Sequence, residues 1–288
     1  DSFITTFGII LNTKKKNAVN VGKKVVNILN NKNLHFLLEE KSADMLQIKE
    51  NKADFALLRE KADFILLFGG DGTFLHTAHH FSGTNIPLLG INLGSLGFMT
   101  EIEVDQFDKA LDGILNGDYT IEKRMMLEAR VLRNDYEVFH SFGLNDVVIN
   151  RGANSHLINI DLQINGEFVS HYRGDGLILA TPTGSTAYSF SAGGPIVNPN
   201  IRAILITPIC PHSLHVRPMV ISEEETIEIV VSGEEEQMNI ATDGRFNYDL
   251  MCEDHISISA SDNDISLVKL PDRTFYTILR EKMRVGLV

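Results

Sequence analysis

One carboxylate stands among glycines in the first half of the chain. The stretch Leu66 to Ala78 reads LLFGGDGTFLHTA, so an apolar run leads into Gly69 and Gly70, and Asp71 separates them from Gly72. Glycines let a phosphate or a ribose approach the backbone, and N–H groups at the start of a helix bind anions. A carboxylate repels phosphates, so its presence beside them indicates a specific role. It could accept the proton of an attacking hydroxyl group or organise a divalent cation. The alternative is a tight turn in which Asp71 caps the following helix.

A second group of polar residues lies in the second half of the chain. Asn145 and Asp146 place an amide beside a carboxylate, and such a pair can hold the diol of a ribose or the polar edge of a base. The segment from Gly174 to Pro195 combines hydroxyl side chains with five glycines, and Tyr188 offers a ring for stacking. This composition favours a polar nucleotide as ligand. The alternatives are an Asx turn at the Asn-Asp pair and a glycine-rich β connection.

Three histidines, His76, His79 and His80, follow the glycine motif. Two histidines spaced by three or four residues on a helix can chelate a metal ion. No carboxylate lies on the same turn, so we favour packed or solvent-exposed histidines and expect no metal held by them. His76, one turn beyond Asp71, is the one that we place near a substrate.

Length and composition limit what these residues can serve. The chain has 288 residues, 43% of them hydrophobic, and a net charge of -12, which predicts two domains and argues against a DNA or RNA partner. Cys210 and Cys252 are too few for a disulfide framework and are not spaced as a zinc site. The chain has no apolar run of membrane-spanning length and no signal-peptide pattern, so we expect a cytoplasmic protein without a membrane partner.

The residues before position 118 alternate between strand and helix patterns. The expected strands are Phe7 to Asn12, Leu34 to Leu38, Asp63 to Phe68 and Ile86 to Asn92. Strands that alternate with helices predict a mainly parallel, Rossmann-like sheet covered on both faces. We therefore expect an α/β domain over residues 1–117. Its glycine motif follows a strand at the sheet edge where such folds bind ligands.

The helical period disappears after Tyr119. Short alternating runs replace it, separated by turn pairs such as Asn165-Gly166 and Asp243-Gly244. We therefore expect an all-β antiparallel domain over residues 118–270, with DISLVKL as its last strand. An amphipathic pattern predicts a C-terminal helix within residues 271–288 that returns to the first domain.

Five blocks of the sequence together resemble the NAD kinase family, a branch of the superfamily that includes diacylglycerol kinases, sphingosine kinases and 6-phosphofructokinases. The blocks are GGDGT, GINLGSLGF (90–98), LNDVVINRG (144–152), YRGDGLILATPTGSTAYSFSAGGPIV (172–197) and TPICPHSLHVRPMVI (207–221). They extend from the glycine motif into the β part and leave roughly the first and last sixty residues weakly covered. Each block alone is a weak signal, but their combination in order is specific.

The resemblance implies transfer of the γ-phosphoryl group of ATP to the 2′-hydroxyl of the adenosine ribose of NAD, which gives NADP. Asp71 would receive the hydroxyl proton, and a divalent cation, expected to be Mg²⁺, would bridge the triphosphate. A homodimer or homotetramer built through the β domain is also implied. The residues placed at the nucleotide site are Gly72, His76, Phe98, Asn145, Asp146, His156, Arg173, Asp175, Thr186, Ala187, Tyr188, Ser189, Phe190, Ser191 and Arg245.

Two questions and two rival functions stay open at this point. Arg245 ends the segment ATDGR, where relatives vary and often carry an uncharged residue. An arginine there could add a phosphate contact and shift the preference toward polyphosphate as donor or NADH as acceptor. A lipid or sugar kinase is the rival enzyme, but the region after Gly174 is polar rather than apolar. A noncatalytic dinucleotide sensor is the rival of another class, and the intact GGDGT argues against it.

Overall fold

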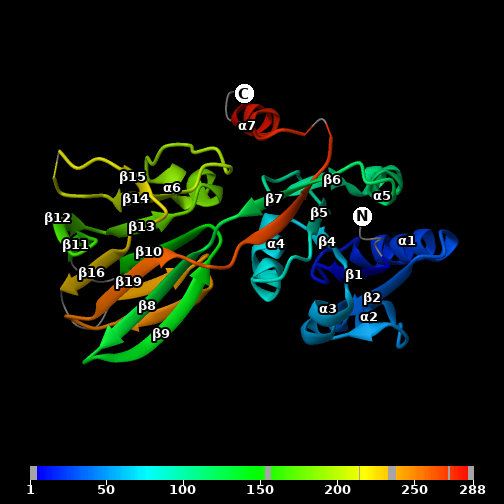
Figure 1. Ribbon diagram of the computed structural model, residues 1–288, viewed down its shortest axis with the longest axis horizontal. Coiled ribbons are helices and arrows are strands. Elements are labelled where there is room, and N and C mark those ends of the chain that lie inside the picture. Colours follow the sequence, from blue (N-terminus) through cyan, green and yellow to red (C-terminus); the bar gives the residue numbers. More distant parts are fainter. Residues whose placement is uncertain (1–4, 153–156, 214, 233–237, 272, 285–288) are drawn as a thin grey trace. The chain divides into compact units, whose positions relative to one another are not determined.

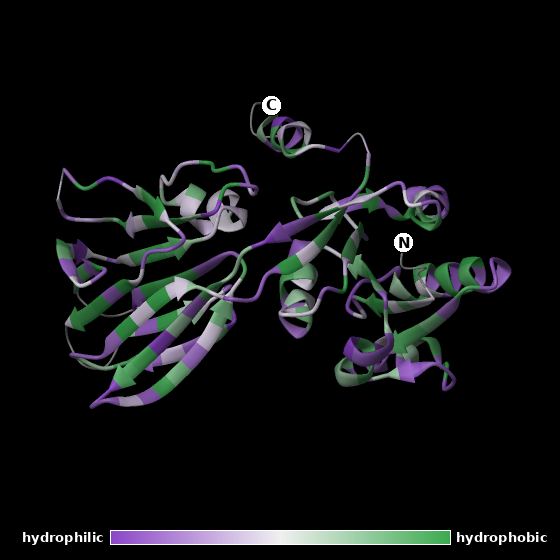
Figure 2. Ribbon diagram, viewed as in Figure 1, coloured by the Kyte–Doolittle hydropathy of each residue, from purple (hydrophilic) through white to green (hydrophobic). Residues whose placement is uncertain are grey.

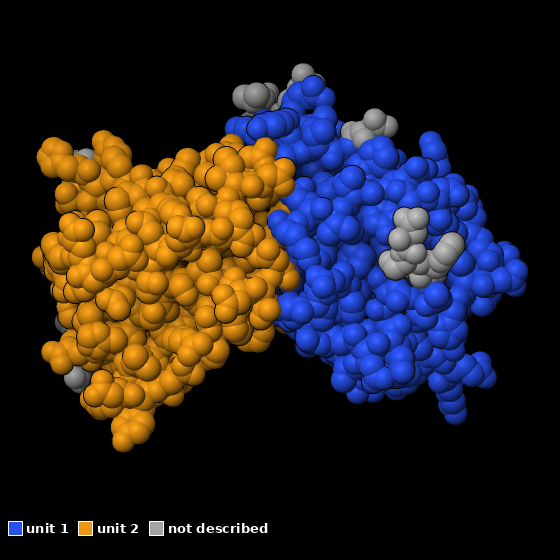
Figure 3. All heavy atoms as spheres, viewed as in Figure 1, with its two compact units in different colours: residues 1–123, 265–288 blue, residues 124–264 orange. Residues whose placement is uncertain are grey.

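The chain forms two compact units, coloured separately in Figure 3. The computed structural model describes residues 5–152, 157–213, 215–232, 238–271 and 273–284. Unit 1 comprises residues 1–123 and 265–288, and unit 2 comprises residues 124–264. The chain therefore leaves unit 1 once and returns to it near its end.

Unit 1 is an α/β unit (Figure 1). Its strands are β1 (Thr6–Leu11), β2 (His35–Glu39), β3 (Lys52–Ala53), β4 (Phe64–Gly69), β5 (Leu88–Asn92), β6 (Thr100–Glu103), β7 (Thr120–Arg124) and β20 (Ile265–Lys269). Its helices are α1 (Ala18–Asn31), α2 (Glu40–Leu46), α3 (Phe55–Lys61), α4 (Asp71–Ala78), α5 (Phe107–Leu115) and α7 (Phe275–Arg284), with 3₁₀ helices η1 (His79–Phe81) and η2 (Val104–Gln106). The sheet order is β3-β2-β1-β4-β5-β20-β7, and β6 also pairs with β5.

The sheet of unit 1 is mainly parallel, which confirms the expected fold class. Strands β1, β2, β4 and β5 pair in parallel, and β4, between β1 and β5, is buried at every residue, as is typical of a central strand in a parallel sheet. Helix α1 buries Val21, Val25 and Leu29, which recur at a spacing of four and form one apolar face. The carboxyl ends of β1, β4 and β5 consequently meet at one edge of the sheet.

Strand β20 lies in a different sheet from the one expected. We predicted that DISLVKL would end the β domain, but Leu267 of β20 pairs in parallel with Leu88 of β5 in unit 1. Lys269 forms an ion pair with Glu101 of β6, which is only 2% exposed. The prediction was wrong because an apolar run indicates a strand but does not indicate which sheet the strand joins. All residues of β20 before Lys269 are buried, as is typical of a parallel strand.

The end of the chain also belongs to unit 1. Ile278 of α7 is buried, and Arg273, which precedes α7, donates a 3.4 Å hydrogen bond to the carbonyl of Gly97. Across the described ranges, the structure contains no helix that is both long enough and apolar enough to span a membrane.

Unit 2 consists of two six-stranded sheets, with orders β15-β14-β13-β10-β17-β18 and β12-β11-β16-β19-β8-β9. Their strands are β8 (Leu127–Arg133), β9 (Tyr136–Gly143), β10 (Asp146–Arg151), β11 (Ile158–Ile164), β12 (Glu167–Gly174), β13 (Gly176–Ala180), β14 (Ala203–Ile209), β15 (Met219–Ser222), β16 (Ile227–Ser232), β17 (Met238–Thr242), β18 (Phe246–Leu250) and β19 (His255–Ala260). Between β13 and β14 lie the 3₁₀ helix η3 (Thr183–Thr186) and the short helix α6 (Tyr188–Ser191).

The strand pairings of unit 2 are antiparallel, as predicted. Figure 2 shows hydrophobic and hydrophilic residues alternating along these strands, and the inward residues of both sheets form one core. The predicted turn pairs are confirmed by their backbone. Asn165 and Gly166 have φ of 51° and 78°, and Asp243 and Gly244 have φ of 49° and 66°, as tight hairpin turns require.

Candidate functional site

The glycine that ends β4 and the two that follow it differ in what surrounds them. A Cβ on Gly69 would lie 2.6 Å from the Cβ of Thr73, so close packing against the first turn of α4 requires glycine there. A Cβ on Gly70 or Gly72 would meet nothing within 4 Å. Packing therefore does not explain these two glycines. They leave the backbone at the N-terminus of α4 uncovered, where N–H groups can receive an anionic ligand.

Asp71, the first residue of α4, directs its carboxylate to the loop that follows β5. Its Oδ2 accepts the N–H of Phe98 at 2.8 Å, and its Oδ1 accepts the N–H of Met99 at 3.0 Å. No side-chain capping bond is made at the start of the helix. The turn-and-cap alternative therefore does not describe Asp71. Each carboxylate oxygen can still accept another hydrogen bond, so the group is oriented without being saturated.

Two asparagines that sequence reasoning missed lie at the same sheet edge. Asn12 follows β1 and donates from Nδ2 to Oγ1 of Thr73 at 2.8 Å. Asn92 ends β5 and is 4% exposed, and its Nδ2 has no hydrogen-bond partner among the described residues. A buried amide without a protein partner is a group that a ligand or water satisfies. The signal in the sequence was available, because each asparagine directly follows an apolar run.

The histidines after Asp71 pack with aromatic rings. His80 stacks on Phe55 with ring centroids 3.7 Å apart, and the rings of His76 and His80 meet edge to face at 5.7 Å. In the part of the chain that the structure describes, no three His, Cys, Asp or Glu side chains gather closely enough to hold a metal ion. The stacking of His80 on Phe55 accounts for His80 without a metal ion. His76 lies on α4, one turn beyond Asp71.

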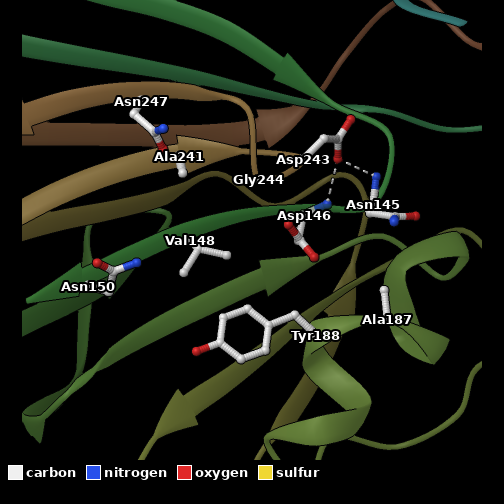
Figure 4. Close-up of a pocket in the computed structure, with 10 residues that line it drawn as sticks. All are labelled: Asn145, Asp146, Val148, Asn150, Ala187, Tyr188, Ala241, Asp243, Gly244 and Asn247. Carbon is white, nitrogen blue, oxygen red and sulfur yellow. Dashed lines mark hydrogen bonds between the residues drawn. The ribbon is translucent and has the colours of Figure 1, made fainter. Parts of the chain in front are cut away.

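Unit 2 contains a pocket of about 360 Å³ on one face of the sheet that includes β10 (Figure 4). Its lining residues are Asn145, Asp146, Val148, Asn150, Ala187, Tyr188, Ala241, Asp243, Gly244 and Asn247. The period of the strand explains this lining. Side chains alternate along β10, so Asp146, Val148 and Asn150 face the pocket while Val147 and Ile149 lie in the core between the sheets.

The Asn145-Asp146 pair stands at one end of this pocket, beside the turn that contains Asp243 (Figure 4). Oδ1 of Asp243 accepts the N–H groups of Asn145 at 2.7 Å and Asp146 at 3.1 Å. A Cβ on Gly184 would lie 2.0 Å from the carbonyl oxygen of Asn145, so the connection to α6 packs directly on this pair. The pair is thus rigidly placed.

The electrostatics of the pair are unusual. Burial raises the pKa of Asp146 to about 7, and the negative charge of Asp243 adds to this shift. Oδ1 of Asn145 is buried without a hydrogen-bond partner among the described residues. A carboxyl group that titrates near neutral pH and an unsatisfied amide oxygen mark this end of the pocket as a binding-site candidate.

The predicted segment from Thr186 to Ser191 is only partly in the pocket. Ala187 and Tyr188 line it, and Tyr188 is 45% exposed. Ser189 is instead fully buried, with its Oγ 2.9 Å from Oγ1 of Thr207. Thr186, Phe190 and Ser191 are not among the lining residues. Val148, Asn150, Ala241, Asp243, Gly244 and Asn247 line the pocket but were not predicted.

Three further predicted residues of unit 2, Arg173, Asp175 and Arg245, are not among the residues that line the pocket. Arg245 is exposed and follows the lining residue Gly244. Arg173 is exposed on β12, and Asp175 pairs with Arg151, whose Nε lies 2.6 Å from its Oδ1. His156 lies outside the described residues. Arg151 was missed because a basic residue at the end of a strand carries no distinguishing pattern.

Comparison with known proteins gives one consistent result. The ATP-NAD kinase N-terminal domain matches residues 7–119, and the ATP-NAD kinase C-terminal domain matches residues 144–270. An NAD kinase of Thermoanaerobacter sp. is 41% identical over 276 residues, which cover 96% of this chain and 98% of that protein. An NAD kinase of Caldanaerobacter subterraneus subsp. tengcongensis is 42% identical with the same coverage.

Solved structures agree with the sequence matches. The crystal structure of yeast NADH kinase complexed with NADH matches with a TM-score of 0.85 and 27% identity over 95% of this chain and 85% of that one. An NAD kinase from Archaeoglobus fulgidus in complex with ATP matches with a TM-score of 0.73 and 25% identity over 97% and 98% of the two chains. This chain therefore belongs to the ATP-NAD kinase family.

Proposed function

We propose that this chain transfers the γ-phosphoryl group of ATP to the 2′-hydroxyl of the adenosine ribose of NAD, giving NADP. The observation that carries the proposal is the carboxylate of Asp71, held by two backbone N–H groups beside the uncovered backbone of Gly70 and Gly72. A kinase needs an oriented acceptor for the hydroxyl proton next to a phosphate-binding backbone. Family membership supplies the two substrates.

In this proposal Asp71 orients the attacking hydroxyl group and takes its proton late in a loose transition state. A carboxylate is a weak base for an alcohol, so its position contributes more than its basicity. The N–H groups of Phe98 and Met99 fix that position. His76 and Phe98 are proposed to lie near the substrate, and Gly72 offers its N–H group to phosphate.

The pocket of unit 2 is the proposed site for the dinucleotide. Asn145 and Asp146 offer an amide and a carboxyl group to the hydroxyls of a ribose, and Tyr188 with Ala187 offers a surface for a planar ring. Contacts from Arg173, Asp175 and Arg245 remain predictions from the family resemblance. The same applies to Thr186, Ser189, Phe190, Ser191 and His156.

Magnesium is proposed to enter with the nucleotide, as the complex of Mg²⁺ and ATP. The described residues do not fit a dedicated metal site, because both oxygens of Asp71 accept backbone N–H groups and no cluster of three ligands is present among them. Mg²⁺ is often held largely by substrate phosphates and water. The homodimer or homotetramer and the cytoplasmic location likewise remain predictions.

A coupled assay for NADP formation tests the proposal. The purified chain is incubated with Mg²⁺ and each pairing of ATP or polyphosphate with NAD or NADH, and the product is measured with an NADP-specific dehydrogenase. ATP-dependent formation of NADP from NAD is the expected result. Binding of NAD without product would favour the noncatalytic sensor. In a parallel incubation with a lipid in place of NAD, phosphorylation of the lipid would favour the rival kinase.

A further inference from the structure

Asp243 and Thr181 satisfy the backbone of the turn formed by residues 144–146. The carboxylate of Asp243 accepts all three N–H groups of this turn, at 2.8 Å from Leu144, 2.7 Å from Asn145 and 3.1 Å from Asp146. The N–H of Asp243 donates to the carbonyl of Asp146 at 3.0 Å. Thr181 donates from Oγ1 to the carbonyl of Leu144 at 2.5 Å and from its N–H to the carbonyl of Asn145 at 2.9 Å. Every backbone N–H and carbonyl group of the turn is thereby paired.

The backbone of Asp243 has the conformation of a tight hairpin turn. Its φ of 49° lies in the left-handed region, which glycine, asparagine and aspartate adopt more readily than other residues. Glycine or asparagine would therefore serve the turn as well as aspartate does. A hairpin turn needs no carboxylate that reaches another strand. The three hydrogen bonds to residues 144–146 supply the reason for this residue.

Asp243 also places a negative charge beside Asp146. The ionisable side chains that line the pocket are Asp146, Asp243 and Tyr188. From β13, on the other side of β10, the uncharged Ala180 lies opposite Asp146, and Arg245 in the Asp243 turn is exposed. Burial raises the pKa of Asp146 to about 7, and the repulsion from Asp243 adds to the shift. Within this set, the one close charge that acts on Asp146 is a like charge.

We infer that Asp243 is a positioning residue for dinucleotide binding, acting through the Asn145-Asp146 pair by three backbone hydrogen bonds and by its charge. The inference rests on the proposed function, in which this pair contacts NAD. Asp243 itself does not touch the reacting atoms. Its loss should therefore weaken NAD binding while the phosphoryl transfer step keeps its rate.

The variants Asp243→Asn and Asp243→Ala test the two contributions. The amide introduced by Asp243→Asn keeps Oδ1 as acceptor for Asn145 and Asp146 but turns an N–H₂ group toward the N–H of Leu144. The variant Asp243→Ala removes all the acceptors. We expect the KM for NAD above pH 8 to rise about fivefold in Asp243→Asn and at least about tenfold in Asp243→Ala, with kcat within about twofold of the wild type. Thermal unfolding of both variants shows whether they fold.

The pH profile separates positioning from mere stability. In the wild type the KM for NAD should change with a midpoint near the pKa of Asp146, about 7. Asp243→Asn removes the like charge, so the midpoint should fall to lower pH. The matched control is Asp63→Asn, because Asp63 also accepts two backbone N–H groups from another segment, those of Thr5 and Thr6 at 2.9 Å. The control should leave both the KM and the midpoint unchanged.

The variant Asn145→Ala distinguishes failure of this inference from failure of the proposed function. If Asn145→Ala leaves the KM for NAD unchanged, the pocket is not the NAD site and the proposed function fails at that point. If Asn145→Ala raises the KM but folded Asp243→Asn has a wild-type KM and an unshifted midpoint, the inference about Asp243 is overturned. A fall in the melting temperature of Asp243→Asn without a change in KM or midpoint also overturns it.

Discussion

The carboxylate of Asp71 accepts the backbone N–H of Phe98 at 2.8 Å, across 27 residues of sequence. This hydrogen bond joins the glycine motif after β4 to the glycine-rich loop after β5. The loop therefore serves the carboxylate directly, by fixing the direction in which its oxygens point. Two motifs that look independent in the sequence act as one structural element of unit 1.

Gly97→Ala should abolish most of the activity by displacing this carboxylate. A Cβ at position 97 would lie 2.0 Å from Oδ1 of Asp71, far inside van der Waals contact. We expect kcat to fall at least about a hundredfold, because a misplacement of about 1 Å is that costly for a positioned group. The measurement is the steady-state rate of NADP formation together with the melting temperature.

Gly113→Ala is the matched control. A Cβ at position 113 would lie 3.7 Å from the Cβ of Asp118, which is an ordinary van der Waals distance. Gly113 lies within α5. Alanine there should raise the free energy of unfolding by up to about 1 kcal/mol and leave kcat unchanged. Wild-type kcat in Gly97→Ala would show that the carboxylate tolerates displacement, contrary to the role given to Asp71.

Asp146→Asn should change how stability depends on pH. Because the pKa of Asp146 rises to about 7 on folding, the folded chain binds more protons than the unfolded chain between about pH 4 and 7. The free energy of unfolding of the wild type therefore falls as the pH rises through this interval. The fall is about 1.4 kcal/mol per pH unit and up to about 4 kcal/mol in total. The variant lacks the titrating group and lacks this slope.

Thermal unfolding of both chains at pH 5, 6, 7 and 8 checks this sign. Asp146→Asn should gain melting temperature relative to the wild type as the pH rises. A constant difference in melting temperature between the two chains would refute the raised pKa of Asp146.

For Asp63 the dependence of stability on pH has the opposite sign. Burial raises its pKa, but hydrogen bonds from Thr5 and Thr6 outweigh burial and hold the pKa below its ordinary value. In a separate series from about pH 3 to 5, Asp63→Asn should accordingly lose melting temperature relative to the wild type as the pH rises.

Lys269→Met should destabilise unit 1 strongly. Glu101 is 2% exposed and pairs with Lys269, and its other oxygen accepts the N–H of Leu270 at 3.3 Å. Removal of the lysine leaves a buried carboxylate without its cation, at a cost of about 3–5 kcal/mol. The double variant Lys269→Met with Glu101→Gln should recover most of this loss, since the amide stays neutral and still accepts from Leu270. Denaturant unfolding followed by circular dichroism gives both values, and equal stability of the single and double variants would contradict the account.

Much of the fold could be predicted because local patterns and packing agree. The apolar faces of α1 and the alternation along β10 are visible in the sequence, and the Asp243-Gly244 pair marks its turn. The placement of β20 could not be predicted. Its apolar residues fit either sheet, and only the pairing of Leu267 with Leu88 decides between them.

The candidate site was predicted where a motif carries the chemistry, as at Asp71, Asn145 and Asp146. It was not predicted where side chains meet only through folding. Asp243 was seen as a turn residue, because nothing in the sequence shows that its carboxylate accepts N–H groups about a hundred residues earlier in the chain. Ser189 looked like a ligand hydroxyl but is buried against Thr207.

The proposed phosphoryl transfer depends on the carboxylate of Asp71 more than on any other side chain. The most direct test compares wild type and Asp71→Asn in a single-turnover assay of NADP formation from ATP and NAD, with NAD binding measured by calorimetry on the same samples. We expect Asp71→Asn to bind NAD with an affinity within about threefold of the wild type and to form NADP at least about a thousandfold more slowly. Turnover by Asp71→Asn at the wild-type rate would contradict the role of this carboxylate.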